Sequence, residues 1–266
     1  MANFNPLKIT SYNCQGVKDR NYNYLNELFN NCDVLLLQET WLYNFEHSIF
    51  NNILQPCQYH AISSMDEGNV IHHGRPHGGT AIIWHQNINL SVVPINTLSK
   101  RICAVHIKGD MFDCIFASIY MPNDDNSNKN FEIFGDVLHE ISTLISLYED
   151  SDIILGGDFN VDFSRNYSRN LNIFKHFLND EELLCPSTQL PPNNFTCEDV
   201  FGNRSFIDHF LMSKSINYND ISIQYDGNNL SDHNPIIINT TYNAKYLKQS
   251  ENRRCKNHEL DWSING

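Results

Sequence analysis

Residues 152–160 read Asp-Ile-Ile-Leu-Gly-Gly-Asp-Phe-Asn, a short apolar run followed by two glycines, a carboxylate and an amide. The run is strand-sized and begins with β-branched residues, so it predicts a buried β-strand. Polar side chains that follow a buried strand are held over the edge of a rigid sheet, where functional groups are often presented. Asp158 and Asn160 are therefore candidate site residues. Taken alone, the same stretch could also be an ordinary Asx turn.

Similar short runs recur along the chain. They are rich in Ile, Val, Phe and Tyr, they are separated by Gly, Pro, Asn and Asp, and each predicts a strand. They span residues 7–12, 33–38, 59–63, 80–84, 90–95, 101–107, 113–120, 206–212, 221–225 and 235–240. Apolar residues at helical spacing predict helices near 24–29, 131–148 and 171–179. Many strands with few helices predict an α+β fold in which two sheets pack face to face with helices outside.

The composition limits the classes of protein that the chain can be. Of its 266 residues 41% are hydrophobic, which is enough for a real core. The net charge of −13 argues against a protein that coats DNA passively, because phosphate affinity normally rests on an excess of Lys and Arg. An enzyme that meets phosphate through a divalent cation is still compatible with that charge.

The sequence offers no membrane or secretion signal. No apolar run approaches the ~18 residues of a membrane span, and the amino terminus has neither a basic nor an apolar leader region. We therefore expect an intracellular protein of the nucleus or cytoplasm, with no membrane partner. None of the eight cysteines forms a C-x-x-C pair, so the sequence predicts reduced thiols and no structural zinc site.

The chain divides into two parts of different character. Residues 1–241 carry all of the strand and helix patterns and are expected to form one domain, whereas residues 242–266 lack apolar periodicity. This second part is basic and reads as a tail or linker. Its basic residues are Lys245, Lys248, Arg253, Arg254 and Lys256.

Further polar residues stand at the ends of the predicted strands. They are Asn13, Glu39, Tyr120, Asp208, Asp232 and His233. Each could be a turn or cap residue by itself, but so many at the ends of separate apolar runs are hard to explain by turns alone. Glu39 and Asp232 offer the hard oxygen ligands that Mg²⁺ or Mn²⁺ takes, and Asn13 and Asn160 offer amide donors for a phosphate.

Two further roles complete this set. Asp158 is a candidate general acid or base, and Asp208 with His233 could form a carboxylate–imidazole pair. Metal-assisted hydrolysis of a phosphoester needs these groups: metal ligands, phosphate donors and an acid or base.

The order and the residues of these motifs resemble those of the endonuclease/exonuclease/phosphatase superfamily. The matching blocks are Asn13, Gln38-Glu39-Thr40, Ser118-Ile119-Tyr120-Met121-Pro122-Asn123, Gly156-Gly157-Asp158-Phe159-Asn160, Ile207-Asp208-His209 and Ser231-Asp232-His233. The resemblance covers residues 7–241. It implies a four-layer α/β sandwich, with two mixed β-sheets packed face to face and flanked by helices.

Within the superfamily, the chain most resembles the apurinic-endonuclease-like domain of non-LTR (LINE-type) retrotransposon polyproteins. The segments 78–83, 118–123 and 205–208 fit that branch, and the basic tail lies where such polyproteins continue into a reverse transcriptase domain. Cellular repair members carry an acidic residue where this chain has Gln15. That difference counts against a repair enzyme and leaves Glu39 as the main metal ligand.

The resemblance implies Mg²⁺-dependent hydrolysis of a DNA phosphodiester, and we expect the enzyme to be a monomer. Glu39 and Asp232 would hold the metal, while Asp158, fixed by Asn160, would orient or deprotonate the attacking water. The sequence leaves open whether Asp158 or Tyr120 is the base.

The other residues would contact the phosphate. His233, held by Asp208, would donate to a phosphate oxygen, and Asn13, Asn160 and Tyr120 would bind the same group. Arg75, in a predicted loop, is expected to touch DNA.

Three functions remain open at this point. The first is a nicking endonuclease that opens target DNA for retrotransposition. The second is another hydrolase of the superfamily, either an apurinic-site repair nuclease or a phosphatase acting on inositol phosphates or lipid head groups. The third is an inactive, domesticated binding module, which the complete set of candidate residues disfavours.

Overall fold

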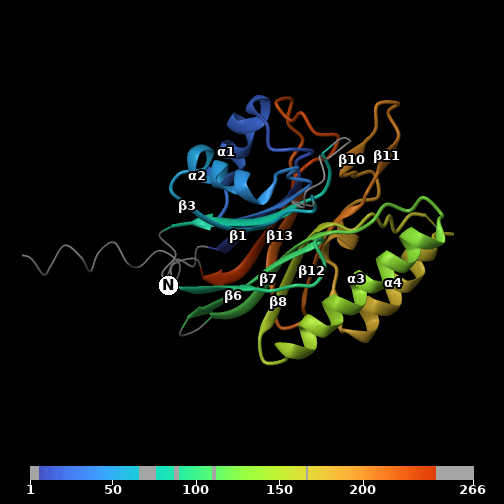
Figure 1. The fold of residues 1–266 in the computed structure, drawn as a ribbon. Coiled ribbons are helices and arrows are strands. Elements are labelled where there is room, and N and C mark those ends of the chain that lie inside the picture. The colour runs from blue at the N-terminus through green and yellow to red at the C-terminus, as the bar shows by residue number, and fades with distance from the viewer. Residues whose placement is uncertain (1–5, 66–75, 87–89, 110–111, 166, 244–266) are drawn as a thin grey trace, which may run out of the picture.

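The computed structural model describes residues 6–65, 76–86, 90–109, 112–165 and 167–243. Two six-stranded β-sheets lie face to face in these residues (Figure 1). The first sheet has the order β13-β14-β1-β2-β4-β3. Its strands are β1 Pro6–Asn13, β2 Val34–Gln38, β3 Cys57–Ile62, β4 Thr80–His85, β13 Tyr218–Ile223 and β14 Ile236–Asn243.

The second sheet has the order β5-β6-β7-β8-β12-β9. Its strands are β5 Ser91–Ile95, β6 Ile102–Gly109, β7 Phe112–Tyr120, β8 Asp152–Asp158, β9 Leu183–Leu184 and β12 Asp208–Ser213. A separate short hairpin is formed by β10 Cys197–Glu198 and β11 Arg204–Ser205.

Both sheets are mixed. In the first, β1 and β2 run parallel, and in the second β7 and β8 run parallel, while the remaining pairs are antiparallel. Parallel neighbours finish at the same edge of a sheet, so residues that follow β1 and β2 lie together, as do those that follow β7 and β8. The strand pairing thereby decides which polar residues can meet.

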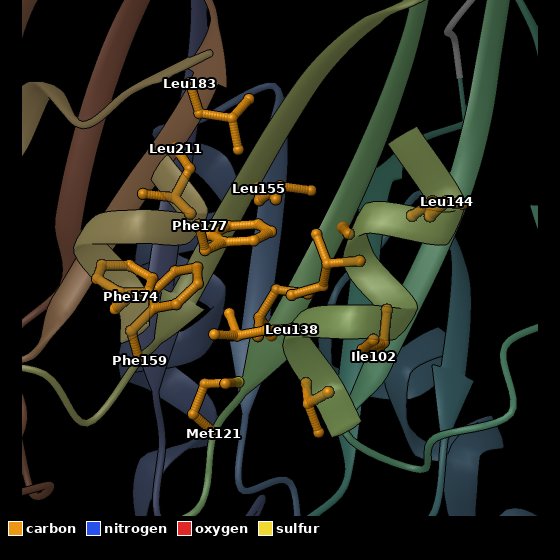
Figure 2. Close-up of a cluster of buried hydrophobic side chains, with 14 of the residues drawn as sticks. Ile102, Met121, Leu138, Leu144, Leu155, Phe159, Phe174, Phe177, Leu183 and Leu211 are labelled. Carbon is orange, nitrogen blue, oxygen red and sulfur yellow. The ribbon is translucent and has the colours of Figure 1, made fainter. Parts of the chain in front are cut away.

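Helices cover the outer face of each sheet, which gives four layers (Figure 1). Helices α1 (Tyr22–Asn30) and α2 (Phe50–Ile53) pack on the first sheet through a cluster that includes Leu25 and Phe50. Helices α3 (Asn128–Leu147) and α4 (Arg169–Asp180) pack on the second, and Figure 2 shows Leu138 and Phe174 among the side chains of that cluster. A third cluster fills the space between the two sheets.

The sequence explains where the two long helices begin. Ser127 and Ser168 precede α3 and α4, and their hydroxyls accept hydrogen bonds from the backbone N–H groups of Asn130 and Leu171. Such N-caps satisfy donors that the first turn of a helix leaves unpaired.

A buried polar bridge joins the two sheets at one end. Gln38, the last residue of β2, donates through Nε2 to the Ser118 Oγ of β7 at 2.9 Å. The Ser118 hydroxyl in turn donates to the carbonyl of Leu37 at 2.8 Å. A buried hydrogen bond of this kind fixes the position of one sheet relative to the other, because leaving either partner unpaired is costly.

The predicted two-sheet sandwich is confirmed, with all eleven predicted strands and the three predicted helices present. The prediction did not include α2, the three 3-10 helices or the two-residue strands β9, β10 and β11. Segments this short carry no apolar periodicity that could identify them. None of the helices in the described ranges is long and apolar enough to cross a membrane.

Candidate active site

Strand ends from both sheets meet at one end of the sandwich. The first sheet contributes Asn13, the last residue of β1, and Glu39, which follows β2. The second contributes Tyr120 and Asp158, which end the paired strands β7 and β8. Because β12 runs antiparallel to β8, its first residue, Asp208, lies opposite Asp158.

Asn13 connects the carboxylates of the two sheets. Its side-chain Nδ2 donates to Glu39 Oε1 at 3.0 Å and to Asp158 Oδ2 at 2.9 Å. The Asn13 side chain is fully buried, and its Oδ1 accepts from the backbone N–H of Gln15 at 3.3 Å. One amide therefore holds two acidic groups side by side that would otherwise repel each other.

Glu39 lies in a tight turn just beyond β2. Its backbone φ is 52°, in the left-handed region that residues other than glycine rarely adopt. Its second oxygen, Oε2, accepts from the Trp41 indole at 2.9 Å. Since each carboxylate oxygen accepts more than one hydrogen bond or metal bond, both oxygens keep room for a cation.

His233 lies between two buried aspartates. Its Nδ1 is 2.8 Å from Asp208 Oδ2, and its Nε2 is 3.9 Å from Asp158 Oδ2. Burial alone would lower the pKa of His233, but the charges of Asp208 and Asp158 raise it well above its usual value. The imidazole is therefore protonated at neutral pH and donates to Asp208.

Burial has the opposite effect on Asp158. Desolvation of its carboxylate raises the pKa to about 7, with Asp208 and Glu39 adding to the rise. His233 and the Asn13 hydrogen bond act in the other direction. Asp158 thus changes its charge close to neutral pH.

Tyr120 and Arg101 form a pair beside the carboxylates. The Arg101 Nη1 donates to the Tyr120 carbonyl at 3.2 Å, and the guanidinium carbon lies 5.2 Å from the centre of the Tyr120 ring. Burial raises the pKa of Tyr120, as do Glu39 and Asp158, so its hydroxyl keeps its proton at neutral pH. Burial lowers the pKa of Arg101, but the negative charges of Glu39 and Asp158 oppose that shift.

Sequence reasoning did not identify Arg101. It precedes β6 and reaches the site only because β6 pairs with β7, which sets Ile102 against Ile119. A charged residue immediately before an alternating strand was the only signal available in the sequence.

The structure places the remaining predicted residues as follows. The backbone N–H of Asn160 donates to Asp158 Oδ1 at 3.0 Å, whereas its side-chain amide donates to the Met121 carbonyl at 3.0 Å. Asp232 is 36% exposed, and its Oδ1 lies 3.7 Å from His233 Nε2. Arg75 lies outside the described residues.

The donors at this end suit a divalent cation. Within the described part of the chain, buried oxygens of Asp208 and Asp232 have no hydrogen-bond partner. Asp158, Asp208 and His233 each bring a possible ligand atom within 4.8 Å of the other two. With Glu39 added, the set is dominated by carboxylate oxygens, which are the usual ligands of Mg²⁺ and Mn²⁺.

Comparison with known sequences gives one family. The sequence model described as "Endonuclease/Exonuclease/phosphatase family" matches residues 10–233, which span every residue of the strand-end cluster. No curated protein sequence matches the chain.

Several solved structures share the fold. The 3′ phosphatase NExo from Neisseria, bound to product DNA hairpin, is 20% identical with a TM-score of 0.67, over 88% of this chain and 99% of that one. The endonuclease domain of TRAS1, a telomere-specific non-LTR retrotransposon, is 15% identical with a TM-score of 0.67, over 88% and 98%. The mannosyl-6-phosphatase Bt3783 of Bacteroides thetaiotaomicron is 17% identical with a TM-score of 0.61, over 88% and 99%.

Proposed function

The chain belongs to the endonuclease/exonuclease/phosphatase family, whose members are nucleases or phosphoesterases, and from that premise we propose that it is a DNA endonuclease. It would hydrolyse one phosphodiester of target DNA with the help of Mg²⁺ or Mn²⁺. The observation that carries this proposal is the Asn13 amide, whose Nδ2 donates to Glu39 of one sheet and to Asp158 of the other. A candidate metal ligand and a candidate base are thereby fixed side by side.

In this proposal the chain's own residues have separate tasks. Glu39 and Asp232 would hold the cation, which when bound neutralises phosphate charge and stabilises the leaving 3′ oxygen. Asp158 accepts a proton from the attacking water, a task for which a pKa of about 7 is well matched at neutral pH. The backbone N–H of Asn160 orients the Asp158 carboxylate for this transfer.

The groups that keep their protons would bind the phosphate. Tyr120 has a raised pKa and acts as a hydroxyl donor, so we assign the role of base to Asp158. His233, protonated and oriented by Asp208, supplies a positive charge to a phosphate oxygen. Arg101 adds a second cation close to the same carboxylates.

The hairpin next to the site supports DNA as the substrate. Between β10 and β11 the side chains of Val200 and Phe201 are 93% and 86% exposed. Cys197 of the same hairpin forms an isolated backbone bridge with His233, which places the hairpin against the catalytic loop. Exposed apolar side chains on such a projection can enter a DNA groove between base steps.

Cations at this end of the molecule offset its acidic body. The Lys18 ammonium lies 4.2 Å from the centre of the Trp41 ring, whose indole contacts Glu39. Arg204 stands on β11, where its guanidinium carbon is 4.1 Å from the centre of the Phe195 ring. Lys18, Arg101 and Arg204, the last of which also pairs with Glu198 at 3.0 Å, would add positive charge for DNA phosphates.

The fold likeness to the TRAS1 endonuclease domain supports a role in retrotransposition, in which the enzyme nicks target DNA and is joined to a reverse transcriptase. A second candidate is a phosphatase acting on a small phosphoester. The net charge of −13 favours it, as does the fold likeness to a mannosyl-6-phosphatase.

A comparison of substrates tests the proposal. Purified protein with Mg²⁺ is incubated in parallel with supercoiled plasmid, an abasic oligonucleotide, a 3′-phosphorylated hairpin, mannose 6-phosphate and inositol phosphates. We expect nicking of intact plasmid, with no comparable release of inorganic phosphate, and loss of nicking in Glu39→Gln. Preference for the abasic site would indicate a repair enzyme, and phosphate release alone would indicate a phosphatase. If the wild-type protein acts on none of these substrates, an enzymatic function is contradicted.

A further inference from the structure

Three different metal-ligating side chains come together on the outer side of His233. The thiol of Cys197, a carboxylate oxygen of Asp232 and a ring nitrogen of His233 all lie within 4.8 Å of one another. Backbone contacts bring them together, because Cys197 forms a β-bridge with His233 and the N–H of Glu198 donates to the Asp232 carbonyl at 2.8 Å. The short hairpin is thus attached to the loop that carries the imidazole.

The imidazole is already oriented as a metal ligand. Its Nδ1 donates to Asp208 at 2.8 Å, which leaves Nε2 between Asp232 Oδ1 at 3.7 Å and Asp158 Oδ2 at 3.9 Å. A ligating histidine in proteins usually donates its other nitrogen to a carboxylate in this way.

Asp232 supplies a second donor that lacks a hydrogen-bond partner. Its Oδ1 is buried, has no such partner among the described residues, and is 3.7 Å from His233 Nε2. In a tetrahedral zinc site, nitrogen and oxygen ligands at ~2.0–2.1 Å from the ion lie about 3.4 Å apart. A movement of a few tenths of an ångström would therefore let both bind one ion.

We propose that Cys197, Asp232 and His233 form a metal site that takes a thiophilic divalent cation such as Zn²⁺, shares Asp232 with the proposed Mg²⁺ site, and inhibits the enzyme while the ion is bound. A thiolate and an imidazole favour Zn²⁺ over Mg²⁺, which prefers oxygen ligands of the kind found at Glu39. Cys197 is only half-buried and Asp232 is partly exposed, so the ion has access from solvent.

Binding would block the catalytic imidazole directly. On binding, the Cys197 thiol and the protonated Nε2 of His233 would each lose a proton to solvent, and the sulfur and Nε2 would then bind the ion. The imidazole can then no longer donate to a phosphate oxygen. The binding site stands independently of the enzymatic function, whereas its inhibitory effect rests on the proposed function.

Cobalt is the probe for binding, because Co²⁺ replaces Zn²⁺ and a cobalt–thiolate bond gives a charge-transfer absorption in the near ultraviolet. The full chain is titrated with Co²⁺ as wild type, as Cys197→Ser and as Cys185→Ser. Cys185 is the matched control because it is also half-buried, while its sulfur contacts Ser187 and belongs to no ligand cluster among the described residues.

We expect the wild type and Cys185→Ser to bind one Co²⁺ with this band, which Zn²⁺ then abolishes, and Cys197→Ser to lack the band. No band in the wild type, or an unchanged band in Cys197→Ser, would overturn the site.

A second measurement tests inhibition. Plasmid nicking at fixed Mg²⁺ is followed as Zn²⁺ is added. We expect Cys197→Ser to require at least about 10-fold more Zn²⁺ for half-inhibition than the wild type, because the loss even of a group that only supports a metal ligand costs about 10-fold or more in affinity. Equal sensitivity of the two proteins would overturn the inhibitory role. If the wild type gives the cobalt band but does not nick DNA, the metal site is confirmed, whereas the proposed endonuclease function and its inhibition by Zn²⁺ are both refuted.

Discussion

The Nδ1 of His233 donates to Oδ2 of Asp208 over 2.8 Å, although the two residues enter the site from different elements. Asp208 begins β12, while His233 lies in the loop that leads into β14. Both side chains are almost completely buried, so the ion pair is shielded from water and strongly coupled. The bond fixes the plane of the imidazole and also keeps it protonated, and each effect can be removed by mutation.

Asp208→Asn should keep the shape of the pair while removing its negative charge. The pKa of His233 is raised chiefly by the Asp208 carboxylate, so it should fall in the variant. Since the proposed role needs the protonated imidazole, the loss of activity at high pH should begin at a lower pH than in the wild type. At neutral pH we expect turnover to fall by about 10²-fold. A pH–rate profile and an NMR titration of His233 measure the two effects.

Asp113→Asn is the matched control for that variant. Asp113 contacts His106 Nε2 at 2.6 Å, but it stands near the start of β7, at the opposite end of the strand from Tyr120. Turnover and its pH dependence should be unchanged there. Equal losses in the two variants would mean that destabilisation, and not the charge at His233, explains the result.

Asn13→Ala should shift the acidic limb of the pH–rate profile, where activity rises with pH. Asp158 must be ionised to accept a proton, so activity should rise as the pH increases through its pKa of about 7. The hydrogen bond from Asn13 lowers that pKa, and its removal should therefore move the rise to higher pH. We expect turnover near pH 7 to fall by about 10-fold or more, with partial recovery in alkaline buffer. An unmoved profile would show that Asn13 does not influence the ionisation of Asp158.

Much of this site could be predicted from the sequence because strand ends are visible in it. Apolar runs that end in Asn13, Glu39 and Asp158 identify residues held at a sheet edge, and parallel pairing brings such ends together. The bridging role of Asn13 could not be predicted, since it depends on the distance between two sheets that the polar contact of Gln38 with Ser118 helps to fix.

Contacts that depend on strand register also could not be predicted from the sequence. Arg101 meets Tyr120 because β6 and β7 pair in one particular register, and a shift by one residue would turn alternate side chains to the other face. Cys197 meets His233 through a two-residue strand that carries no periodic pattern. The side-chain contacts of Asn160 likewise depend on the turn that follows β8.

Glu39→Gln should remove metal-dependent activity with little effect on folding. The amide has the same shape as the carboxylate but lacks the charge that a Mg²⁺ ligand supplies. We expect nicking to fall by about 10³-fold or more and Mn²⁺ affinity to fall in parallel, as measured by calorimetry. Glu27→Gln, an exposed change on α1, is the control and should match the wild type. Full Mn²⁺ affinity in Glu39→Gln would place the metal elsewhere.

Arg101 should contribute through its planar guanidinium as well as its charge. It donates to the Tyr120 carbonyl and lies over the Tyr120 ring, contacts that a lysine ammonium reproduces only in part. We expect kcat/KM to fall by about 10-fold in Arg101→Lys and by about 10²-fold in Arg101→Met. Arg169→Met is the control, since that guanidinium contacts Asn128 and the Phe131 ring on the α3–α4 side. Equal activity of the two Arg101 variants would show that a positive charge at this position contributes nothing once the guanidinium is lost.

Gly157, the residue before Asp158, should be important for stability, whereas Gly135 in helix α3 should be replaceable. A Cβ added at Gly157 would lie 2.0 Å from the Ile119 carbonyl oxygen of the neighbouring strand β7, a backbone atom that cannot move aside without breaking the sheet. Gly157→Ala should therefore lower the free energy of unfolding by about 3 kcal/mol. Because Asp158 is the next residue, activity should fall even at temperatures where the variant remains folded.

Gly135→Ala provides the opposite expectation within the same molecule. Gly135 lies inside α3, and a Cβ there would meet no atom within 4 Å. Alanine loses less conformational freedom than glycine when a helix forms, so this variant should gain about 1 kcal/mol. Urea denaturation of both variants measures the two signs. If Gly157→Ala were as stable as the wild type, the close approach of β7 to β8 at this residue would be wrong, and with it the distance across which Asn13 reaches Asp158.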